Sequence, residues 1–404
     1  MSASAPSSSI VRWRGRCGDL SAADRRALFD RALSADDSIR QRSAAIVRRV
    51  REHGDAALRD MARDFDGVAL DSLEVPRVAW QRALGALDPA LRRSMERAAA
   101  NIARVHESFA PVPHETESEP GIVVGRRPDP LARVGVYAPG GRAAYPSSVL
   151  MGAVPARVAG VGEIILCSPP DRATGRPADV VLAAAALAGV DRVFALGGAG
   201  AIAAMAFGTS SVPRVDRIVG PGNAYVAEAK LQVAHAVAID SPAGPSELLV
   251  LGDASAEPGL VAREMLAQAE HDPLAAVVAV VSDAPLAQRI LDELAQQLPA
   301  QPRAAIAGAA LSGQGAVLVA DDLDEAIAVA NAYAAEHLLL LLADPDPALT
   351  RLRGAGTIFV GASSSVAFGD YMTGANHVLP TGGLARSYSG LSTLDFVRWT
   401  TYQR

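Results

Sequence analysis

From about residue 123 onward, short apolar runs alternate with longer segments whose apolar residues recur at helical spacing. The short runs predict strands and the longer segments predict helices. Strands are expected at residues 134–137, 163–167, 192–196, 217–219, 248–251, 276–281, 315–319, 337–342 and 357–360. Helices are expected at residues 148–158, 180–188, 201–208, 256–270, 286–297 and 323–333. This alternation is typical of βαβ units, which build parallel sheets covered by helices on both faces.

The two ends of the chain have other patterns. Residues 1–20 are expected to form a loosely docked tail, and residues 22–106 show helical periodicity. A loop rich in Pro and Glu is expected at residues 111–121, and Gly- and Ser-rich loops are expected at residues 361–390. The last residues before Arg404 predict the beginning of a helix.

Together these patterns predict an α/β protein with two incomplete Rossmann-like domains and a helical N-terminal region. The larger domain is expected to join residues 35–133 to residues 246–390, and the second domain to span residues 134–245. Residues 1–34 are expected to form a tail and a helix, and residues 391–404 to begin a C-terminal helical tail.

Composition and charge narrow the classes of function. The net charge is −6, from 38 Lys and Arg against 44 Asp and Glu, so charge gives no reason to expect nucleic acid or an anionic membrane as a partner. No apolar stretch reaches the roughly 18–20 residues that span a bilayer. The two cysteines, Cys17 and Cys167, are far apart in the chain, which excludes a disulfide framework and fits a reducing compartment. A cytoplasmic protein is expected.

Two pairs of polar residues stand at expected helix ends. Gln268 and His271 are three residues apart, so their side chains share a face in the last helical turn, although a polar helix cap explains them as well. Glu336 and His337 separate a helix from a strand. A carboxylate beside an imidazole at a sheet edge suits acid–base chemistry, and a solvated turn is the alternative.

A third pair, Asp370 and His377, lies in the long irregular segment. Such segments are often functional loops, although an ordinary surface loop is an equal alternative. Together Gln268, His271, Asp370 and His377 offer nitrogen and oxygen ligands that suit zinc or manganese. No local spacing between them requires a metal.

Glycine-rich turns follow three of the expected strands, at residues 138–141, 197–200 and 220–223. Turns of this kind between a strand and a helix let the backbone approach a dinucleotide closely. The spacing Gly198-x-Gly200-x-x-Ala203 even matches a Rossmann fingerprint, although one such match also arises by chance.

Six segments, in this order, resemble the histidinol dehydrogenase family. They are residues 134–149, Gly-Pro-Gly-Asn at 220–223, Ala-Gly-Pro-Ser-Glu at 243–247, Gln-Ala-Glu-His-Asp-Pro at 268–273, Glu-His at 336–337 and Asn-His-Val-Leu-Pro-Thr-Gly-Gly at 376–383. Gly-Asp-Ala-Ala-Leu at 54–58 and Phe-Asp-Gly at 65–67 fit as well, so the resemblance runs from about residue 35 to the end of the chain.

The resemblance implies a homodimeric enzyme that oxidises L-histidinol to L-histidine in two hydride transfers to NAD. His337 would exchange protons with the substrate, and Glu336 would activate water. Three residues would be ligands of Zn²⁺, namely Gln268, His271 and Asp370. Ser246 and His377 would contact the substrate along with these ligands, and Tyr137 and Asn223 would contact the dinucleotide.

Two departures from the family pattern leave alternatives open. The family usually has glutamine where this chain has Gly200, which is expected to alter dinucleotide binding. The family also continues past residues 389–392 into a helical tail with a substrate-binding glutamate and a further zinc-ligating histidine, and both residues are expected to be missing from a chain that ends at Arg404. A dehydrogenase of another small alcohol, such as a sulfonate diol, or a catalytically impaired fragment are therefore the alternatives to a histidinol dehydrogenase.

Overall fold

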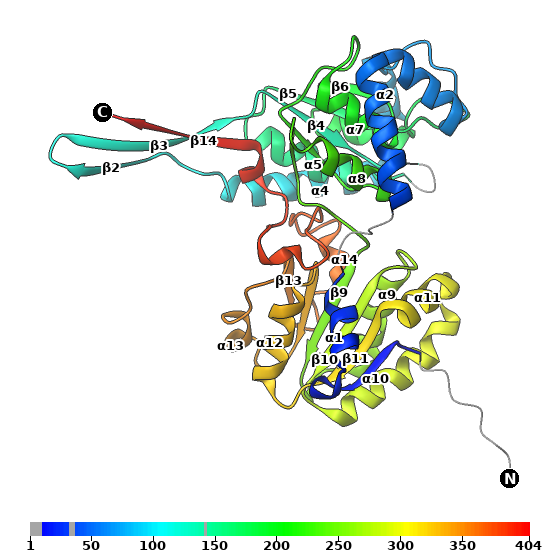
Figure 1. The fold of residues 1–404 in the computed structure, drawn as a ribbon, viewed down its shortest axis with the longest axis vertical. Helices are drawn as coiled ribbons and strands as arrows, with labels where there is room; N and C mark the ends of the chain where they lie inside the picture. Colours follow the sequence, from blue (N-terminus) through cyan, green and yellow to red (C-terminus); the bar gives the residue numbers. More distant parts are fainter. Residues whose placement is uncertain (1–9, 32–36, 141–143) are drawn as a thin grey trace. The chain divides into compact units, whose positions relative to one another are not determined.

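The structure is a computed structural model that describes residues 10–31, 37–140 and 144–404. The chain forms two compact units, each assembled from three segments (Figure 1). Unit 1 comprises residues 1–33, 243–368 and 379–390, and unit 2 comprises residues 34–242, 369–378 and 391–404. Within the described ranges, no helix is long and apolar enough to cross a membrane.

Unit 1 is built on a sheet of six parallel strands. Their order is β1 (Trp13–Arg16), β11 (Gly315–Val319), β10 (Ala276–Val281), β9 (Glu247–Gly252), β12 (His337–Leu341) and β13 (Thr357–Val360). Alternate residues of β9 face opposite sides. Leu248 and Val250 pack with α9 (Pro258–Ala269), α10 (Ala284–Gln297) and α11 (Ala304–Gln314), while Leu249 and Leu251 pack with α1 (Ala22–Phe29) and α12 (Leu323–Tyr333). Both faces are covered, as the continuous apolar strands predicted.

The N-terminal segment corrects one expectation. Residues 1–20 were expected to form a tail, but Trp13 pairs with Ala316, so β1 is an edge strand of the sheet in unit 1. The side chains of Trp13 and Cys17 are buried beneath α1 and α12. A strand of four residues is too short to give a recognisable alternation in the sequence.

Unit 2 contains a sheet of five parallel strands. Their order is β6 (Arg192–Ala195), β5 (Glu163–Ser168), β4 (Arg133–Tyr137), β7 (Arg217–Val219) and β8 (Ala238–Ile239). The chain builds outward from β4 first on one side and then on the other. The strand order therefore reverses between β4 and β7, and this is the point at which open α/β sheets bind ligands.

Helices from the first hundred residues cover this second sheet. Contacts join α2 (Asp37–Met61) to α7 (Gly198–Phe207), α3 (Arg77–Ala86) to α6 (Asp179–Leu187), and α4 (Pro89–Ser108) to α5 (Pro146–Val158). Residues 35–133 thus belong with residues 134–242, and not with residues 246–390 as expected. Periodicity shows that a helix has an apolar face but not which sheet that face covers.

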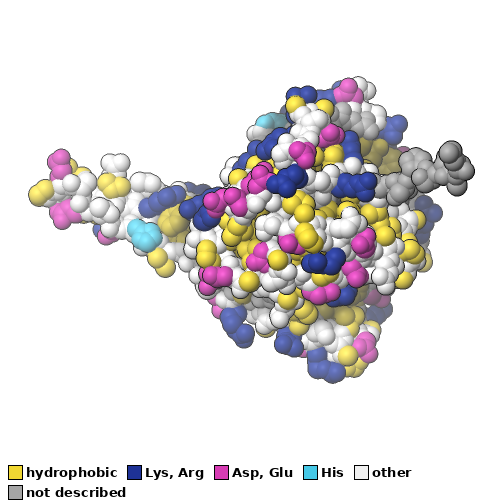
Figure 2. All heavy atoms as spheres, turned by 90° about the horizontal axis from the view of Figure 1, so that it is seen from below, with side chains coloured by type: hydrophobic (Ala, Val, Ile, Leu, Met, Phe, Trp, Pro, Cys, Tyr) yellow, Lys and Arg dark blue, Asp and Glu magenta, His cyan; other side chains and the backbone are white. Residues whose placement is uncertain are grey.

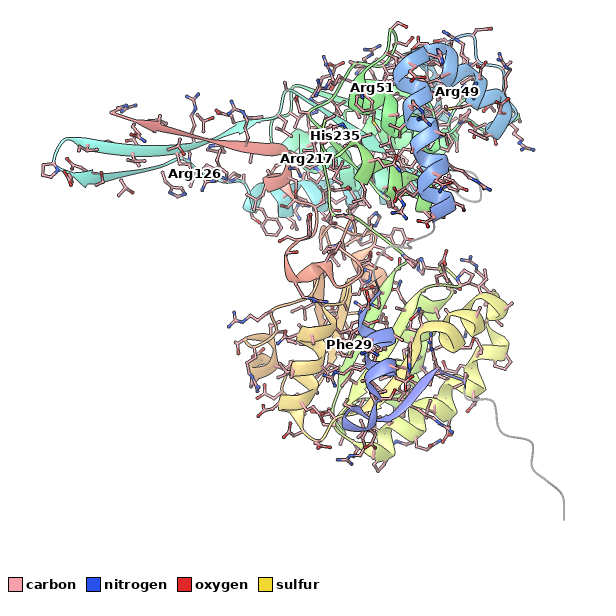
Figure 3. The ribbon with its side chains drawn as sticks, in the orientation of Figure 1. Phe29, Arg49, Arg51, Arg126, Arg217 and His235 are labelled. Carbon is pink, nitrogen blue, oxygen red and sulfur yellow. The ribbon has the colours of Figure 1, made fainter. Side chains whose placement is uncertain are left out.

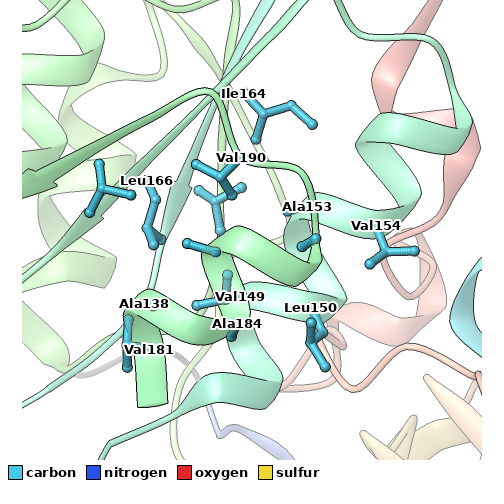
Figure 4. Packing of buried hydrophobic residues seen from close by; sticks show 14 of the residues in the cluster. Ala138, Val149, Leu150, Ala153, Val154, Ile164, Leu166, Val181, Ala184 and Val190 are labelled. Carbon is cyan, nitrogen blue, oxygen red and sulfur yellow. The ribbon is translucent and has the colours of Figure 1, made fainter. Parts of the chain in front are cut away.

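The core of unit 2 is packed with small and β-branched residues. Figure 4 shows part of this core, a cluster that includes Val149 and Ala153 of α5, Val181 and Ala184 of α6, and Leu166 of β5. All five side chains are fully buried. Because the alanine side chain is small, helices rich in alanine can approach the sheet closely and fill the interior without voids. An alanine-rich sequence can therefore build a core.

An antiparallel three-stranded arm extends from unit 2 (Figure 1). Its strands are β14 (Val397–Gln403), β3 (Ile122–Pro130) and β2 (His114–Glu119), in that order. The arm corrects two expectations, since residues 111–121 were expected to be a loop and residues 391–404 the start of a helix. The ring of Tyr402 lies over Gly125 on the facing strand, a cross-strand contact that favours the strand over a helix.

Charge and aromatic contacts line the arm. Figure 2 shows acidic side chains toward its tip and basic side chains nearer its base. The guanidinium carbon of Arg126 lies 4.4 Å from the centre of the Trp399 ring (Figure 3). All six residues of β2 are exposed, so the arm holds together through cross-strand pairs and without a buried core.

One buried histidine gives unit 2 a pH-dependent stability. His106 of α4 is 1% exposed, and among the described residues neither ring nitrogen has a hydrogen-bond partner. Burial lowers the pKa of His106 from 6.5 to about 4. Between these values the unfolded chain binds a proton that the folded chain does not, so the free energy of unfolding is highest above pH 6.5 and falls toward pH 4.

We expect this one residue to cost about 2–3 kcal/mol of stability between pH 7 and pH 4.5. Urea unfolding at both pH values should show the loss in the parent protein and a smaller one in His106→Leu. His114→Leu, which changes an exposed histidine of the arm, is the control and should keep the full loss. Equal pH dependence in parent and His106→Leu would contradict the assignment.

Candidate functional site

Most of the candidate residues of unit 1 lie at the amino edge of its sheet. Glu247 and His337 are the first residues of the neighbouring strands β9 and β12, and α9, which carries Gln268, ends just before β10 begins. Ser246 directly precedes β9, and its carbonyl oxygen accepts a hydrogen bond from the Ala276 N–H (3.0 Å). Open α/β sheets usually bind ligands at the opposite, carboxyl edge, so position in the fold alone would not have identified this site.

Glu336 and His337 form a buried pair, with 6% and 5% of their surface exposed. Nδ1 of His337 lies 2.9 Å from the Glu247 carbonyl oxygen and 3.5 Å from Oε2 of Glu336. A carbonyl oxygen can only accept a hydrogen bond, so Nδ1 carries the proton. Oε2 of Glu336 accepts a hydrogen bond from the Glu247 N–H (2.8 Å). The solvated turn considered above is therefore excluded, because both side chains are held in place inside the unit.

A buried ion pair that the sequence did not reveal stands behind these two residues. Arg31 donates from Nε to Oε1 of Glu247 (2.8 Å) and from Nη2 to Oε2 (3.0 Å). Glu247 belongs to the segment 243–247 that was recognised, but only Ser246 in it was assigned a role. Arg31 lies in an arginine-rich chain and gave no signal of its own.

The Gln268 and His271 pair is arranged differently from the expectation. The helix α9 ends at Ala269, so His271 lies beyond its last turn. The His271 N–H donates to the Gln268 carbonyl oxygen (3.3 Å). Gln268 is buried and His271 is exposed.

Asp370 and His377 lie in unit 2, in the irregular segment 369–378. Nδ1 of His377 donates to the Asp370 carbonyl oxygen (3.0 Å). Burial lowers the pKa of His377, and the nearby Asp370 carboxylate opposes that shift. The buried Asn376 amide donates to the Met151 carbonyl oxygen (2.8 Å), so an internal hydrogen bond fixes this segment to α5.

The structure does not test the three candidate metal ligands as a set. No group of three His, Cys, Asp or Glu residues there is close enough to hold an ion. Gln268 and His271 belong to unit 1, whereas Asp370 belongs to unit 2.

The two candidate dinucleotide residues lie where the strand order of unit 2 reverses. Tyr137 ends β4, and its hydroxyl oxygen accepts a hydrogen bond from the Gly198 N–H (3.0 Å). Burial raises the pKa of Tyr137 to about 12. Asn223 follows β7 and caps α8 (Ala224–Val233), accepting from the Tyr225 and Val226 N–H groups (3.1 and 3.2 Å). Asn223 therefore has a structural role as a helix cap, and its contact with the dinucleotide stays a prediction.

The only lysine of the chain, Lys230, stabilises the glycine turn between β7 and α8. Lys230 donates to the Gly220 carbonyl oxygen (2.9 Å) and pairs with Asp240, which accepts from the Gly220 N–H (2.7 Å). Gly220 has a φ of +116°, and a Cβ there would overlap the Tyr137 carbonyl oxygen. Only glycine fits so close to the end of β4.

A cavity of about 440 Å³ opens beside the carboxyl ends of β4 and β5 in unit 2. Its lining includes Pro139, Ser168, Arg172 and the pair Phe65 and Asp66. Burial raises the pKa of Asp66 to about 6, and Arg172 opposes the shift. A cavity at this edge of a parallel sheet is of the kind that holds a nucleotide.

Gly200 packs against α2. A Cβ at this position would lie 3.0 Å from Sδ of Met61 and 3.5 Å from Cδ2 of Leu58. The fingerprint-like spacing thus serves close packing of α7 against α2, and its effect on dinucleotide binding stays a prediction.

Three comparisons with known proteins identify the same family for this chain. The family described as Histidinol dehydrogenase matches residues 29–404. The chain is 49% identical over 387 residues to the histidinol dehydrogenase of Natronomonas pharaonis, covering 96% of this chain and 90% of that protein. It is 44% identical over 392 residues to the enzyme of Methanosarcina barkeri, covering 96% and 89%. The crystal structure of histidinol dehydrogenase from Elizabethkingia anophelis matches with a TM-score of 0.92 at 34% identity, covering 98% of this chain and 90% of that one.

Proposed function

Because this chain belongs to the histidinol dehydrogenase family, we propose that Glu336 and His337 perform the proton transfers that oxidise L-histidinol to L-histidine, with NAD as the hydride acceptor. The observation that carries the proposal is the buried pair itself. The Glu247 backbone fixes the tautomer of His337 and holds the carboxylate of Glu336 beside it. An acid–base group in a fixed orientation is what repeated proton transfer requires.

The two residues divide the work between the two oxidation steps. In the first step Nε2 of His337 accepts the hydroxyl proton of histidinol, since Nδ1 already carries a proton. A hydride leaves the carbon that bears this hydroxyl group. In the second step Glu336 accepts a proton from the water that adds to histidinal. Loss of a second hydride from the resulting hydrate gives the carboxylate of histidine.

Gln268, His271 and Asp370 are the proposed zinc ligands. They offer an amide oxygen, an imidazole nitrogen and a carboxylate oxygen, a donor set that fits Zn²⁺ and leaves coordination positions for substrate. When bound, zinc supplies a positive charge that orients the amino alcohol and stabilises negative charge on its oxygen. Ser246, at the same sheet edge as His337, and His377 are proposed to contact the substrate.

Tyr137 and Asn223 are the proposed dinucleotide contacts. They flank the reversal point between β4 and β7, and the turn at Gly220 lets backbone come close there. The nearby cavity has room for part of a nucleotide.

A homodimer is also proposed, with the arm as a contact surface. The arm leaves β2 and β14 as edge strands, and Ile122 at its tip is 46% exposed. Exposed strand edges and apolar side chains are commonly covered by another chain.

The deciding experiment is NADH formation from L-histidinol after treatment with a chelator, with and without added Zn²⁺. We expect turnover to fall with the chelator and to return with zinc, in protein that sediments as a dimer. A panel of other amino alcohols and sulfonate diols completes the assay. Turnover of a diol without turnover of histidinol would favour the alternative function, a dehydrogenase of another small alcohol. If folded protein forms no NADH with any of these substrates, the proposal of an active enzyme is contradicted.

A further inference from the structure

We propose that Arg31 and Glu247 form a positioning pair, which orients Glu336 and His337 without touching substrate. The inference rests on the proposed function of those two residues. It is independent of the metal and of the dinucleotide, because every contact that carries it lies within unit 1.

The carboxylate of Glu247 joins three distant parts of the chain. It accepts two hydrogen bonds from Arg31, one from the Gly382 N–H (2.8 Å) and one from the Glu336 N–H (3.3 Å). The side chains of Arg31 and Glu247 are only 5% and 3% exposed. Four donors satisfy the oxygen lone pairs of a carboxylate, and the two-point pairing with arginine fixes its orientation as well as its charge.

The backbone of Glu247 transmits this orientation to the acid–base pair. Its N–H donates to Glu336 and its carbonyl oxygen accepts from His337. Both contacts come from one residue, so a movement of Glu247 would disturb the carboxylate and the imidazole together. The carbonyl contact also decides which ring nitrogen of His337 is protonated.

Arg31 also holds the turn that leads into the pair. Its Nη2 donates to the Tyr333 carbonyl oxygen (2.8 Å), and its guanidinium lies 3.4 Å from the centre of the Tyr333 ring. Tyr333 ends α12, and the next residue, Ala334, has a φ of +51°. Within the described ranges Ala334 is the only non-glycine residue with positive φ, which is a strained conformation for alanine. Arg31 therefore stabilises the bend that delivers Glu336 and His337 to the sheet edge.

The test is Arg31→Lys, which keeps the charge but loses the planar two-point contact. Arg192→Lys is the matched control. Arg192 makes the same two-point contact with Glu74 (2.9 and 2.6 Å) and also donates to a backbone carbonyl, that of Ser211 (3.1 Å), but it lies in unit 2. Thermal unfolding of both variants by circular dichroism shows whether each is folded.

Two readouts separate positioning from simple stability. Steady-state kinetics with saturating NAD should show kcat reduced by about 10–100-fold in Arg31→Lys, as expected for a small displacement of reacting groups, with the KM for NAD within about two-fold. Nitrogen-15 NMR of histidine-labelled protein, with the His337 signals assigned through His337→Asn, should show Nδ1 protonated in the parent and a mixture of tautomers in Arg31→Lys. Arg192→Lys should match the parent in both readouts.

An unchanged kcat together with an unchanged His337 tautomer in folded Arg31→Lys would overturn the proposal. The NMR readout needs no turnover. If the parent protein fails to oxidise histidinol but the His337 tautomer still depends on Arg31, the proposed function fails while the positioning pair stands.

Discussion

Replacing His337 by asparagine is expected to lower kcat for histidinol oxidation by about 10²–10⁴-fold, the usual contribution of a general base. The asparagine amide can donate to the Glu247 carbonyl oxygen as His337 Nδ1 does (2.9 Å), but it has no basic nitrogen. The fold should therefore be retained while the proton acceptor is removed. NADH formation gives kcat, and circular dichroism gives the unfolding temperature.

His235→Asn provides the control for this experiment. Nδ1 of His235 also lies 2.9 Å from a backbone carbonyl oxygen, that of Gln232, but the residue is exposed in unit 2 (Figure 3). This variant should retain parental turnover. If His337→Asn keeps more than about one-tenth of the parental kcat, a loss well short of the usual range, another residue must be the base.

Replacing Lys230 by methionine is expected to lower the free energy of unfolding by about 3–5 kcal/mol, because it leaves a buried carboxylate without its partner. Lys230 and Asp240 are each 5% exposed, and together they hold both polar groups of the Gly220 backbone. Urea unfolding measures the loss. The KM for NAD should rise in the same variant, since the turn beside Tyr137 loses its support.

The double variant Lys230→Met with Asp240→Asn distinguishes charge from packing. It removes both charges, and the asparagine oxygen can still accept from the Gly220 N–H, so most of the lost stability should return. A single methionine variant as stable as the parent would show that the pair adds nothing to stability.

The α/β core could be predicted from the sequence because its strands are continuous apolar runs. Every strand and helix expected between residues 134 and 360 is present, with small differences at the ends, and the fold agrees with the histidinol dehydrogenase structure. The helix expected at the end of the chain is instead the strand β14. Five strands were missed, since none has a buried apolar run long enough to set a period: β1, β8 and the arm strands β2, β3 and β14. The domain grouping was wrong for residues 35–133, because the partner of an apolar helix face is decided by tertiary packing.

The candidate site was only partly visible in the sequence. Glu336 and His337 stand together in the chain at a junction between elements, and the structure shows both side chains buried and 3.5 Å apart. Arg31 was invisible, since its partner Glu247 is 216 positions away and arginine is common in this chain. The fold brings such residues together from distant positions in the chain, so only the three-dimensional structure reveals the pair.

The long separation between paired segments also dictates an order of assembly during synthesis. Residue 13 pairs with residue 316, so the first strand has no neighbour until about three-quarters of the chain has left the ribosome. The sheet of unit 2, complete by residue 239, can form while the N-terminal segment is still unpaired. Arg31 likewise cannot contact Glu247 until residue 247 has been made, so the acid–base pair of unit 1 is positioned only after the strands of the unit 2 sheet have been synthesised.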